Sequence, residues 1–382
     1  MNYNKSVVIT QLRLPHYRVA FFETLRRELN TRGICFSLLH GQPDPAEIDK
    51  QDEGKIEWAT RVKNQYIRWR KKYLAWQPLP SALRNVDLIV ITQENRILSN
   101  YFHIMRRKTN GSMVAFWGHG ANLQSNNPNG LKERFKRWTT KRVDWWFAYT
   151  QLSADLIAAA GFPSNRITVL NNAVDTAELR RQLQSITLEE KSALRESLGF
   201  AAGPAGVFVG SLYAGKRLDF LFAAAEAIRR DVPDFHLLIV GDGPERDKVQ
   251  AWCAAHPWAR WVGARFGREK AVCVSLAQMM LNPGAVGLGI LDAFVCGVPM
   301  LTTNCGMHGP EIAYLDNGRN GVMTEDDLEA YARACVRVLR DPGELSRLRA
   351  GCAASAGKYT MENMVRRFAD GIESALGISS NR

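Results

Sequence analysis

Hydrophobic and polar positions along the chain follow two periods, which predict β-strands joined by amphipathic helices. Ser6–Thr10 has the continuous apolar character of a buried strand, residues 19–29 place apolar side chains at helical spacing, and residues 34–41 form a second apolar run. Short links between strand, helix and strand are typical of a parallel βαβ unit. The first half of the chain is therefore expected to be an α/β domain.

The pattern changes after Asp175 and then begins again. Residues 179–200 are polar with helical spacing, and a new alternation of apolar strands and amphipathic helices starts at residue 206. A chain of 382 residues is long enough for two α/β domains, each with its own core. We therefore place a domain boundary near Asp175, between residues 1–175 and residues 176–360.

The most informative stretch is Leu281–Pro299, where an apolar strand ends at a Pro-Gly turn and a helix begins between glycines. The free N–H groups and the positive end of a helix point at one place there, which suits a phosphate. Gly287 lacks a side chain and allows close approach. Asp292 is placed to accept hydrogen bonds from hydroxyls of the molecule that bears the phosphate. The alternative is an ordinary turn between strand and helix, in which the glycine serves packing.

Other strand ends of the second half also bear glycine or polar residues, namely Gly210-Ser211 followed by Lys216-Arg217, and Gly241-Asp242. The carboxyl ends of parallel strands open onto one crevice, so we expect these residues beside the Gly287 turn. Lys216 and Arg217 would bring positive charge to a phosphate, and a departing diphosphate requires such charge. Each motif alone also occurs as a common turn.

The first half has candidate residues at its own strand ends. His16 and Arg18 lie in the loop after the first strand, Glu94 follows the strand at 86–92, and His119 stands between two glycines after the strand at 113–117. The flanking glycines free the backbone to expose the His119 imidazole, which favours a functional role over a buried structural one. The alternative for the loop residues His16 and Arg18 is that they lie there incidentally and bind nothing.

The net positive charge of the chain is confined to its first half. Residues 1–175 contain 26 lysines and arginines and 14 acidic residues, whereas the remainder contains 24 of each. Residues 55–76 and 131–147 interleave these cations with Trp, Tyr and Phe, a composition that suits an anionic membrane surface. A solvated basic edge is the alternative for these segments. Nucleic acid is the other class of anionic partner, although no nucleic-acid motif accompanies the charge.

The sequence predicts neither a membrane span nor a leader, and it indicates reduced cysteines. No apolar run is long enough to span a membrane, and the N-terminus lacks the apolar core and cleavage site of a leader, so a cytosolic location is expected. The seven cysteines are scattered and never in CxxC spacing, which indicates reduced thiols and neither a zinc site nor a disulfide framework.

Four motifs of the second half occur in an order that resembles the C-terminal domain of retaining glycosyltransferases of family 4. They are FVGSLYAGKRLDFLFAA, LLIVGDGPERDKV, NPGAVGLGILDAFVCGVPMLTT and GPEIAYLDNGRNGV. The first half is similar to the same family at HYRVAFFETL, FWGHG and the segment that leads to Asp175. The resemblance implies the GT-B fold, two Rossmann-like α/β domains that face each other across a cleft. It assigns residues 1–175 to acceptor binding and 176–360 to the nucleotide sugar, with a terminal helix at about 360–380 packing back on the first domain.

The resemblance also implies roles for individual residues. Lys216 matches the lysine that holds the donor's diphosphate, the family's arginine is replaced by Ser211, and Arg217 is the substitute cation that we expect. His119 resembles the histidine beside the donor sugar, and it is implied as catalytic together with Lys216. His16, Arg18 and Glu94 are expected on the side of the acceptor and the sugar. The implied donor-binding residues are Gly210, Ser211, Lys216, Arg217, Gly241, Asp242, Gly284, Val286, Gly287, Leu288 and Asp292.

One departure from the family bears on mechanism. Asp292 falls on the second acidic position of the family's Glu-x7-Glu motif, whereas the first position is Gly284, so no carboxylate is available there to attack the sugar. The remaining route is a front-face displacement, in which the departing diphosphate accepts the proton of the acceptor hydroxyl. We expect no cofactor and no metal, because no Asp-x-Asp pair stands at a strand end and Lys216 can compensate the charge. The donor would be UDP- or GDP-linked.

The leading interpretation is a retaining glycosyltransferase that adds a hexose-type sugar to a lipid-linked or polysaccharide precursor at the cytoplasmic face of the membrane. A nucleotide-sugar epimerase on a similar scaffold is an alternative, with Glu94 and Glu311 as candidate acid and base. A catalytically dead nucleotide-sugar-binding protein is another, suggested by Gly284 and Ser211. A nucleic-acid binder draws only on the basic first half.

Overall fold

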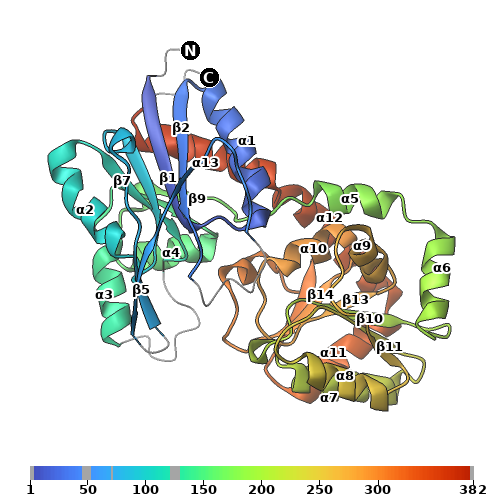
Figure 1. The fold of residues 1–382 in the computed structure, drawn as a ribbon. Helices are drawn as coiled ribbons and strands as arrows, with labels where there is room; N and C mark the ends of the chain where they lie inside the picture. Colours follow the sequence, from blue (N-terminus) through green and yellow to red (C-terminus); the bar gives the residue numbers. More distant parts are fainter. Residues whose placement is uncertain (1–3, 45–52, 70–71, 121–129, 379–382) are drawn as a thin grey trace. The chain divides into compact units, whose positions relative to one another are not determined.

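The computed structural model describes residues 4–44, 53–69, 72–120 and 130–378, and its internal contacts divide the chain into two compact units. Unit 1 comprises Met1–Asp175 together with Met361–Arg382, and unit 2 comprises Thr176–Thr360. The division falls after Asp175, where the sequence pattern changes. Each unit is an α/β domain built on its own parallel sheet (Figure 1).

The sheet of unit 1 is parallel throughout, with the order β3-β2-β1-β6-β7-β8-β9. Its strands are β1 (Lys5–Arg13), β2 (Ile34–Gly41), β3 (Thr60–Val62), β6 (Leu88–Thr92), β7 (Met113–Gly118), β8 (Trp145–Ala148) and β9 (Ile167–Val169). The chain proceeds from β1 to β3 in one direction and from β6 to β9 in the other. The order therefore reverses between β1 and β6, the place where open α/β sheets bind ligands.

Helices cover both faces of this sheet because successive strand residues point to opposite sides. Trp117 of β7 and Phe147 of β8 face α1 (Val19–Thr31) and α13 (Met361–Ala375), where Phe368 packs on both rings at centroid distances of 5.2 and 4.3 Å. Phe116 and Trp146 face the opposite core. That core is shared with α2 (Leu98–Asn110) and α4 (Gln151–Ala159). Helix α3 (Leu131–Thr140) precedes β8.

A two-stranded antiparallel hairpin, β4 (Gln65–Trp69) and β5 (Lys72–Trp76), accompanies the unit 1 sheet. Ala75 is fully buried against Leu12 of β1 and Ile97, which fixes the hairpin beside the carboxyl ends of β1 and β6. The described part of the basic aromatic segment at 55–76 thus includes three strands of unit 1, β3, β4 and β5.

The sheet of unit 2 is also parallel, with the order β12-β11-β10-β13-β14-β15. Its strands are β10 (Ala205–Val209), β11 (His236–Val240), β12 (Ala259–Trp261), β13 (Met279–Leu281), β14 (Met300–Thr303) and β15 (Gly321–Thr324). The strand order reverses between β10 and β13. The loops that follow these two strands are therefore the expected ligand-binding loops of the unit.

Two helical layers enclose the unit 2 sheet (Figure 1). The largest core cluster joins the sheet to α7 (Leu218–Asp231), α8 (Arg246–Ala255) and α11 (Leu328–Arg340). The other layer contains α5 (Ala177–Gln184), α9 (Gly267–Ser275), α10 (Gly289–Cys296) and α12 (Pro342–Lys358), with α6 (Leu188–Ser197) packed on α9. No helix in the described part of the chain is long and apolar enough to cross a membrane.

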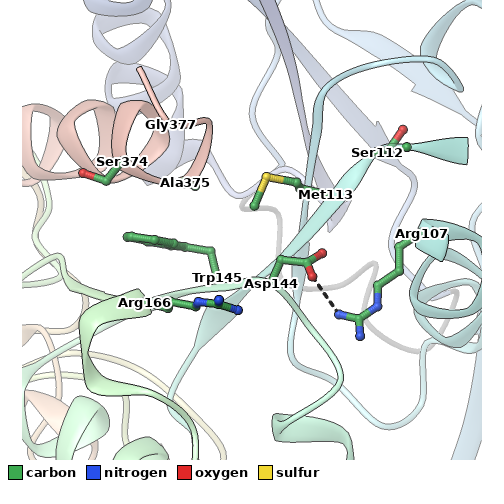
Figure 2. Close-up of a pocket in the computed structure, with 10 residues that line it drawn as sticks. Arg107, Ser112, Met113, Asp144, Trp145, Arg166, Ser374, Ala375 and Gly377 are labelled. Atoms are coloured by element: carbon green, nitrogen blue, oxygen red, sulfur yellow. Dashed lines mark hydrogen bonds and ion pairs between the residues drawn. The ribbon is translucent and has the colours of Figure 1, made fainter. Parts of the chain in front are cut away.

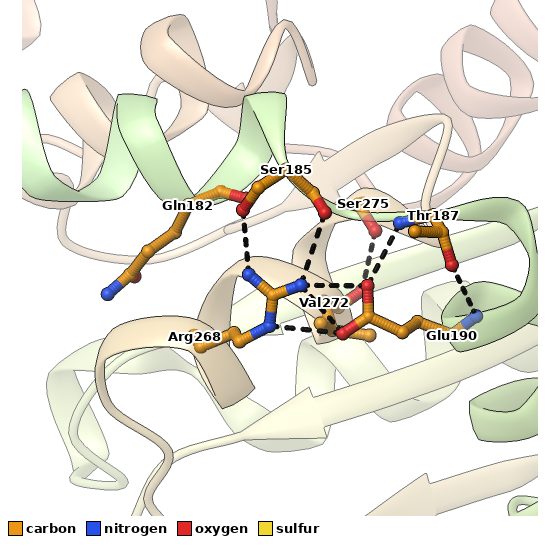
Figure 3. A network of polar contacts seen from close by, with 7 residues as sticks. All are labelled: Gln182, Ser185, Thr187, Glu190, Arg268, Val272 and Ser275. Carbon is orange, nitrogen blue, oxygen red and sulfur yellow. Dashed lines mark hydrogen bonds and ion pairs between the residues drawn. The ribbon is translucent and has the colours of Figure 1, made fainter.

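A polar network joins the first two helices of unit 2 to α9 (Figure 3). The start of α6 is a capping box, in which the Thr187 hydroxyl accepts from the Glu190 N–H at 3.2 Å and the Glu190 carboxylate accepts from the Thr187 N–H at 2.9 Å. Arg268 of α9 donates to both Glu190 oxygens and to the Ser185 hydroxyl. These contacts lower the pKa of Glu190, with the Thr187 N–H as the main cause.

Candidate functional site

The strand-order reversal of unit 2 brings together two loops, Gly210–Arg217 after β10 and Asn282–Leu288 after β13. The Ala285 N–H donates to the Gly215 carbonyl at 2.9 Å, and the Lys216 ammonium donates to the Ala285 carbonyl. The loops are thus held to each other by hydrogen bonds. The sequence prediction that Lys216 lies beside the Gly287 turn is realised in these contacts.

The start of α10 has the features of an anion-binding helix end. Its N-cap, Leu288, makes no side-chain cap, and among the described contacts the N–H groups of Gly287 and Leu288 have no acceptor. A Cβ at Gly287 would meet no atom within 4 Å, so the space in front of it is open. We refer to Gly287, Leu288 and Lys216 as the anion seat.

Lys216 is the cation of this seat. Burial lowers its pKa to about 8, because a desolvated ammonium is disfavoured, and Cys305 opposes the shift only in part. An anion in the seat would favour the charged form and reverse that shift. Lys216 can therefore pair with a phosphate at a half-buried position.

His308 supports the seat and was not among the residues predicted from the sequence. Its Nδ1 accepts from the Val286 N–H at 3.2 Å, so Nε2 bears the proton that is donated to the Thr303 carbonyl at 2.8 Å. The Gly309 N–H donates to the Val286 carbonyl at 2.7 Å. These bonds hold Val286, immediately before the seat, in one orientation. One sequence feature could have indicated His308: residues 305–309 follow β14, at the carboxyl edge of the sheet.

Gly284, where the family has its first carboxylate, has no room for a side chain. A Cβ there would lie 2.5 Å from the Gly215 carbonyl oxygen and 2.6 Å from the carbonyl carbon of Lys216. The same close approach is what brings Lys216 to the seat. The close packing of the two loops therefore explains why no carboxylate side chain stands at position 284.

Arg217 is less available than the sequence suggested. It adopts a left-handed conformation, with φ of 56°, and its guanidinium forms an ion pair with Asp326 and a 3.1 Å hydrogen bond to Thr303 Oγ1. Asp326 compensates its charge, while the guanidinium also donates to the Pro283 carbonyl at 3.4 Å, so Arg217 as a second cation of the seat stays a prediction. The side chain of Ser211 is exposed at the surface of unit 2.

The remaining donor-side residues shape the loops around the seat. Gly241 has φ of 149°, and a Cβ there would lie 1.8 Å from the Gly210 carbonyl oxygen, so the two strand ends touch through backbone alone. Asp242 accepts from the Gly243 N–H at 2.7 Å. On α10, one carboxylate oxygen of Asp292 accepts from Lys270 at 2.9 Å, so Asp292 is an ion-paired acceptor.

Unit 1 has a pocket of about 170 Å³ at its own strand-order reversal. Its walls include Tyr66 and Tyr73 of the hairpin, Tyr17, Glu94 and Arg18. Glu94 accepts from Arg96 at 2.7 Å, so the sugar-side carboxylate that we predicted lines the pocket as part of an ion pair.

Arg18 and His16 differ in accessibility. Arg18 is only 4% exposed: it donates to Asn172 Oδ1 at 2.9 Å and lies 4.8 Å over the Trp117 ring. It therefore forms a wall of the pocket, in contrast to the open loop cation that the sequence suggested. His16 is exposed and packs edge-on against Tyr17.

His119 follows β7 and contacts Tyr149, another residue of the pocket, at a ring-centroid distance of 4.3 Å. The surrounding protein desolvates the charged form and lowers its pKa to about 4, and the charges of Lys136 and Arg18 act in the same direction. Its side chain nevertheless keeps exposed surface. His119 is therefore a neutral hydrogen-bonding group near pH 7.

A second pocket of unit 1, of about 490 Å³, lies at the amino ends of β7 and β8 (Figure 2). It is lined by Met113 and Trp145, the first residues of β7 and β8, and by Asp144, which pairs with Arg107 at 3.0 Å. Ligands of open α/β sheets bind at the carboxyl ends of strands, so this pocket is not the candidate site. Among the described residues, no group of three His, Cys, Asp or Glu side chains could hold a metal ion.

Known proteins similar to this chain agree with this geometry. Residues 203–341 match the model of a family described as "Glycosyl transferases group 1". The GDP-mannose-dependent alpha-(1-6)-phosphatidylinositol monomannoside mannosyltransferase of Mycolicibacterium smegmatis is 29% identical over 215 residues, which cover 53% of this chain and 53% of that protein. The chain thus spans about half the length of this curated relative.

Solved structures match over nearly the whole chain. HepE from Anabaena, in complex with UDP, has a TM-score of 0.69 at 16% identity and covers 97% of this chain and 100% of its own. A putative UDP-N-acetylglucosamine 2-epimerase from Listeria monocytogenes has a TM-score of 0.61 at 13% identity, over 98% and 97%. Likeness at these identities concerns the fold. Residues 203–341 are thus similar to the group 1 glycosyl transferases, and the two parallel α/β units have the GT-B fold.

Proposed function

We propose that the protein is a retaining glycosyltransferase that uses a UDP- or GDP-linked hexose-type sugar as donor. The observation that supports this proposal best is the anion seat, where an uncapped helix start, an open Gly287 and the half-buried Lys216 converge. A diphosphate is the ligand that suits two free backbone N–H groups and one ammonium. HepE was solved with UDP, and the Mycolicibacterium relative is named for GDP-mannose.

The proposed mechanism follows from the packing of the two loops. Because Gly284 has no room for a side chain, the route is a front-face displacement without a covalent sugar intermediate. The acceptor oxygen forms a bond to the anomeric carbon as the bond to the diphosphate breaks, and the departing diphosphate takes the hydroxyl proton. Lys216 and the α10 start stabilise the charge that develops on the diphosphate, without a requirement for a metal. His119, uncharged near pH 7, would hydrogen-bond the sugar without competing for the phosphates.

The proposed acceptor is a lipid-linked or polysaccharide precursor at the cytoplasmic face of the membrane, bound in the tyrosine-lined pocket of unit 1. Tyrosine rings and ion-paired side chains offer flat apolar surface and hydrogen-bonding groups, which suit a sugar. The name of the Mycolicibacterium relative includes a glycosylated phosphatidylinositol as its acceptor. The positive charge of the first half is compatible with an acceptor that bears phosphate.

Thermal stabilisation by UDP, GDP, ADP and their sugar derivatives tests the donor site. A ligand at about 100 times its dissociation constant adds about 2.7 kcal/mol to the free energy of unfolding. We expect one base to be preferred and Lys216→Ala to weaken binding about 10- to 100-fold, because a charge-assisted bond is lost. Failure of every nucleotide to stabilise the folded protein would contradict the proposal. NMR of the product's anomeric proton then tests retention.

An epimerase is the second candidate because the Listeria protein has the same fold. It would require an acid and a base beside the sugar of the donor. Glu94 is ion-paired with Arg96 in unit 1, and Glu311 is 5% exposed in unit 2. Incubation of the preferred donor without acceptor separates the two functions, since only an epimerase would convert it to a second sugar nucleotide. A catalytically dead protein would bind the nucleotide, would not epimerise the donor and would not transfer its sugar to an acceptor.

A further inference from the structure

The β4–β5 hairpin has two unlike faces. Tyr66 and Tyr73 pack edge-on at 5.3 Å on the face that lines the unit 1 pocket. Ile67 and Leu74 are paired across the strands on the other face, where they are 62% and 42% exposed. The hairpin therefore presents a polar aromatic surface to the pocket and an aliphatic surface to the outside.

The aliphatic face continues into exposed aromatic residues of α2 and α3. Trp76 of the hairpin contacts Phe102 of α2 at a centroid distance of 5.7 Å. The neighbouring Tyr101 contacts Phe135 of α3 at 5.5 Å, and Phe135 stacks on Trp138 at 5.7 Å. Figure 1 shows α2, α3 and β5 on the same side of unit 1.

Exposed apolar side chains are concentrated here. In the part of the chain that the structure describes, eleven large hydrophobic side chains are exposed, and six of them belong to these three elements. We define them as the exposed aromatic surface: Ile67, Leu74, Phe102, Met105, Phe135 and Trp138. Met105 and Trp138 are 75% and 53% exposed. A contiguous apolar surface of this kind indicates an interaction site.

The exposed aromatic surface is strongly basic. Within residues 65–76, 98–110 and 131–142, eight of the side chains that the structure describes are lysine or arginine and none is acidic. Arg106 lies 5.3 Å over the Phe102 ring, and Arg142 lies 4.5 Å over Trp138. Some of the cations are compensated, as Arg68 is by Asp44 and Arg107 by Asp144. A partner that suits this surface would be anionic and would offer an apolar phase.

We infer that the exposed aromatic surface docks on an anionic phospholipid bilayer. Trp and Phe at the headgroup level beside Arg and Lys are typical of peripheral membrane binding. Nucleic acid would also accept cations and stacking rings, but Ile67, Leu74 and Met105 are aliphatic and have no planar face on which a base could stack. If the protein also has the proposed function, on which this step rests, the hairpin would place the sugar of a lipid-borne acceptor in the pocket while its lipid stays in the bilayer.

Flotation of the full-length protein with vesicles tests the inference. The vesicles are an equal mixture of phosphatidylcholine and phosphatidylglycerol, with phosphatidylcholine alone for comparison. We expect flotation only with the mixture, and a loss on adding salt. Arg134→Gln with Arg142→Gln should reduce partitioning about fivefold for each cation removed. Phe135→Ser with Trp138→Ser should reduce it at least tenfold. Phe266→Ser is the matched control, because Phe266 is 78% exposed in unit 2, and it should float like the wild type.

Lipids with brominated acyl chains test whether Trp138 itself enters the bilayer, because bromine quenches tryptophan fluorescence at short range. They should quench part of the tryptophan fluorescence of the wild type and less of it in Trp138→Phe. Flotation of the Phe135/Trp138 variant like the wild type would overturn the inference, as would release from vesicles by competing duplex DNA that the protein binds more tightly. Each variant is first checked for an unchanged melting temperature and nucleotide response. Because flotation uses neither donor nor acceptor, it distinguishes failed docking from a failed glycosyltransferase proposal.

Discussion

At the residue scale, Gly287 is important for the space that it leaves open. Its φ lies outside the left-handed region, and a Cβ would meet no protein atom within 4 Å, so the folded chain itself tolerates alanine there. A bound phosphate would not, because the added methyl group projects toward the open side of the seat. Packing alone therefore does not require the glycine, which favours the ligand interpretation over an ordinary turn.

We predict that Gly287→Ala leaves the free energy of unfolding nearly unchanged and weakens nucleotide binding by about 1–3 kcal/mol, the usual cost of overpacking. Calorimetric titration with the preferred nucleotide and urea unfolding measure the two quantities. Gly357→Ala is the control, since Gly357 is equally open but lies in α12. Unaltered nucleotide affinity in Gly287→Ala would show that the ligand does not approach this backbone.

Lys216 makes binding dependent on pH in a known direction. Its pKa of about 8 in the free protein means that it loses its proton as the pH rises through 8, and with the proton goes its attraction for an anion. The diphosphate of a sugar nucleotide is esterified at both ends, so it has no ionisation between pH 7 and pH 9 and adds no change of its own. We predict about tenfold weaker binding at pH 9 than at pH 7, measured by titration.

Two variants separate Lys216 from its neighbours. Lys216→Arg should flatten the pH profile, because arginine stays charged throughout this range. Cys305→Ser removes a nearby thiol, whose pKa burial would raise but hydrogen bonds from His308 and the Met307 N–H lower overall. A wild-type affinity that is equal at pH 7 and pH 9 would contradict the role of Lys216.

At the element scale, apolar periodicity locates most strands and helices but not those that depend on distant contacts. The strand and helix that flank Gly287, β13 and α10, lie where the sequence pattern puts them. The β4–β5 hairpin was not predicted, because its four cations obscure the alternation and Ala75 becomes buried only against Leu12 and Ile97. Helix α2 was missed because its exposed face bears Phe102 and Met105, which hide the amphipathic pattern.

The same limit applies to site residues. Lys216 and Gly287 were found because each lies in a local motif at a strand end. His308 was missed because its partners, Val286 and Thr303, belong to other segments of the chain. Arg18 was expected in an open loop, yet it contacts Met364 of α13, a helix almost 350 residues later in the chain.

We predict that Phe368→Ala destabilises unit 1 by about 3–5 kcal/mol, since Phe368 is fully buried between Phe147, Trp117 and Phe21. Urea unfolding followed by tryptophan fluorescence measures the loss. Phe266→Ala, at an exposed position, should change stability by no more than about 0.5 kcal/mol. Equal effects of the two substitutions would mean that α13 does not complete the core of unit 1.

At the scale of the whole molecule, the chain forms two α/β units that differ in charge and in continuity. Unit 2 is one uninterrupted segment with its own core, whereas unit 1 needs residues from both ends of the chain. The excess positive charge lies in residues 1–175, and the anion seat with its supporting residue His308 lies in unit 2. The anion seat and the excess positive charge therefore belong to different units of the molecule.

We predict that residues 176–360, expressed alone, fold cooperatively and bind the preferred nucleotide within about tenfold of the affinity of the full chain. The physical reason is that the backbone N–H groups of the seat, Lys216 and His308 all come from this segment, and that a domain of this size buries enough apolar surface to be stable. Residues 1–175 without 361–382 should instead be unstable, because Phe147 and Trp117 lose the α13 face. Circular dichroism melts and nucleotide titration measure both fragments. If the 176–360 fragment melts cooperatively but no longer binds nucleotide, the seat is incomplete within unit 2, and the donor must depend on residues of unit 1 as much as on Lys216.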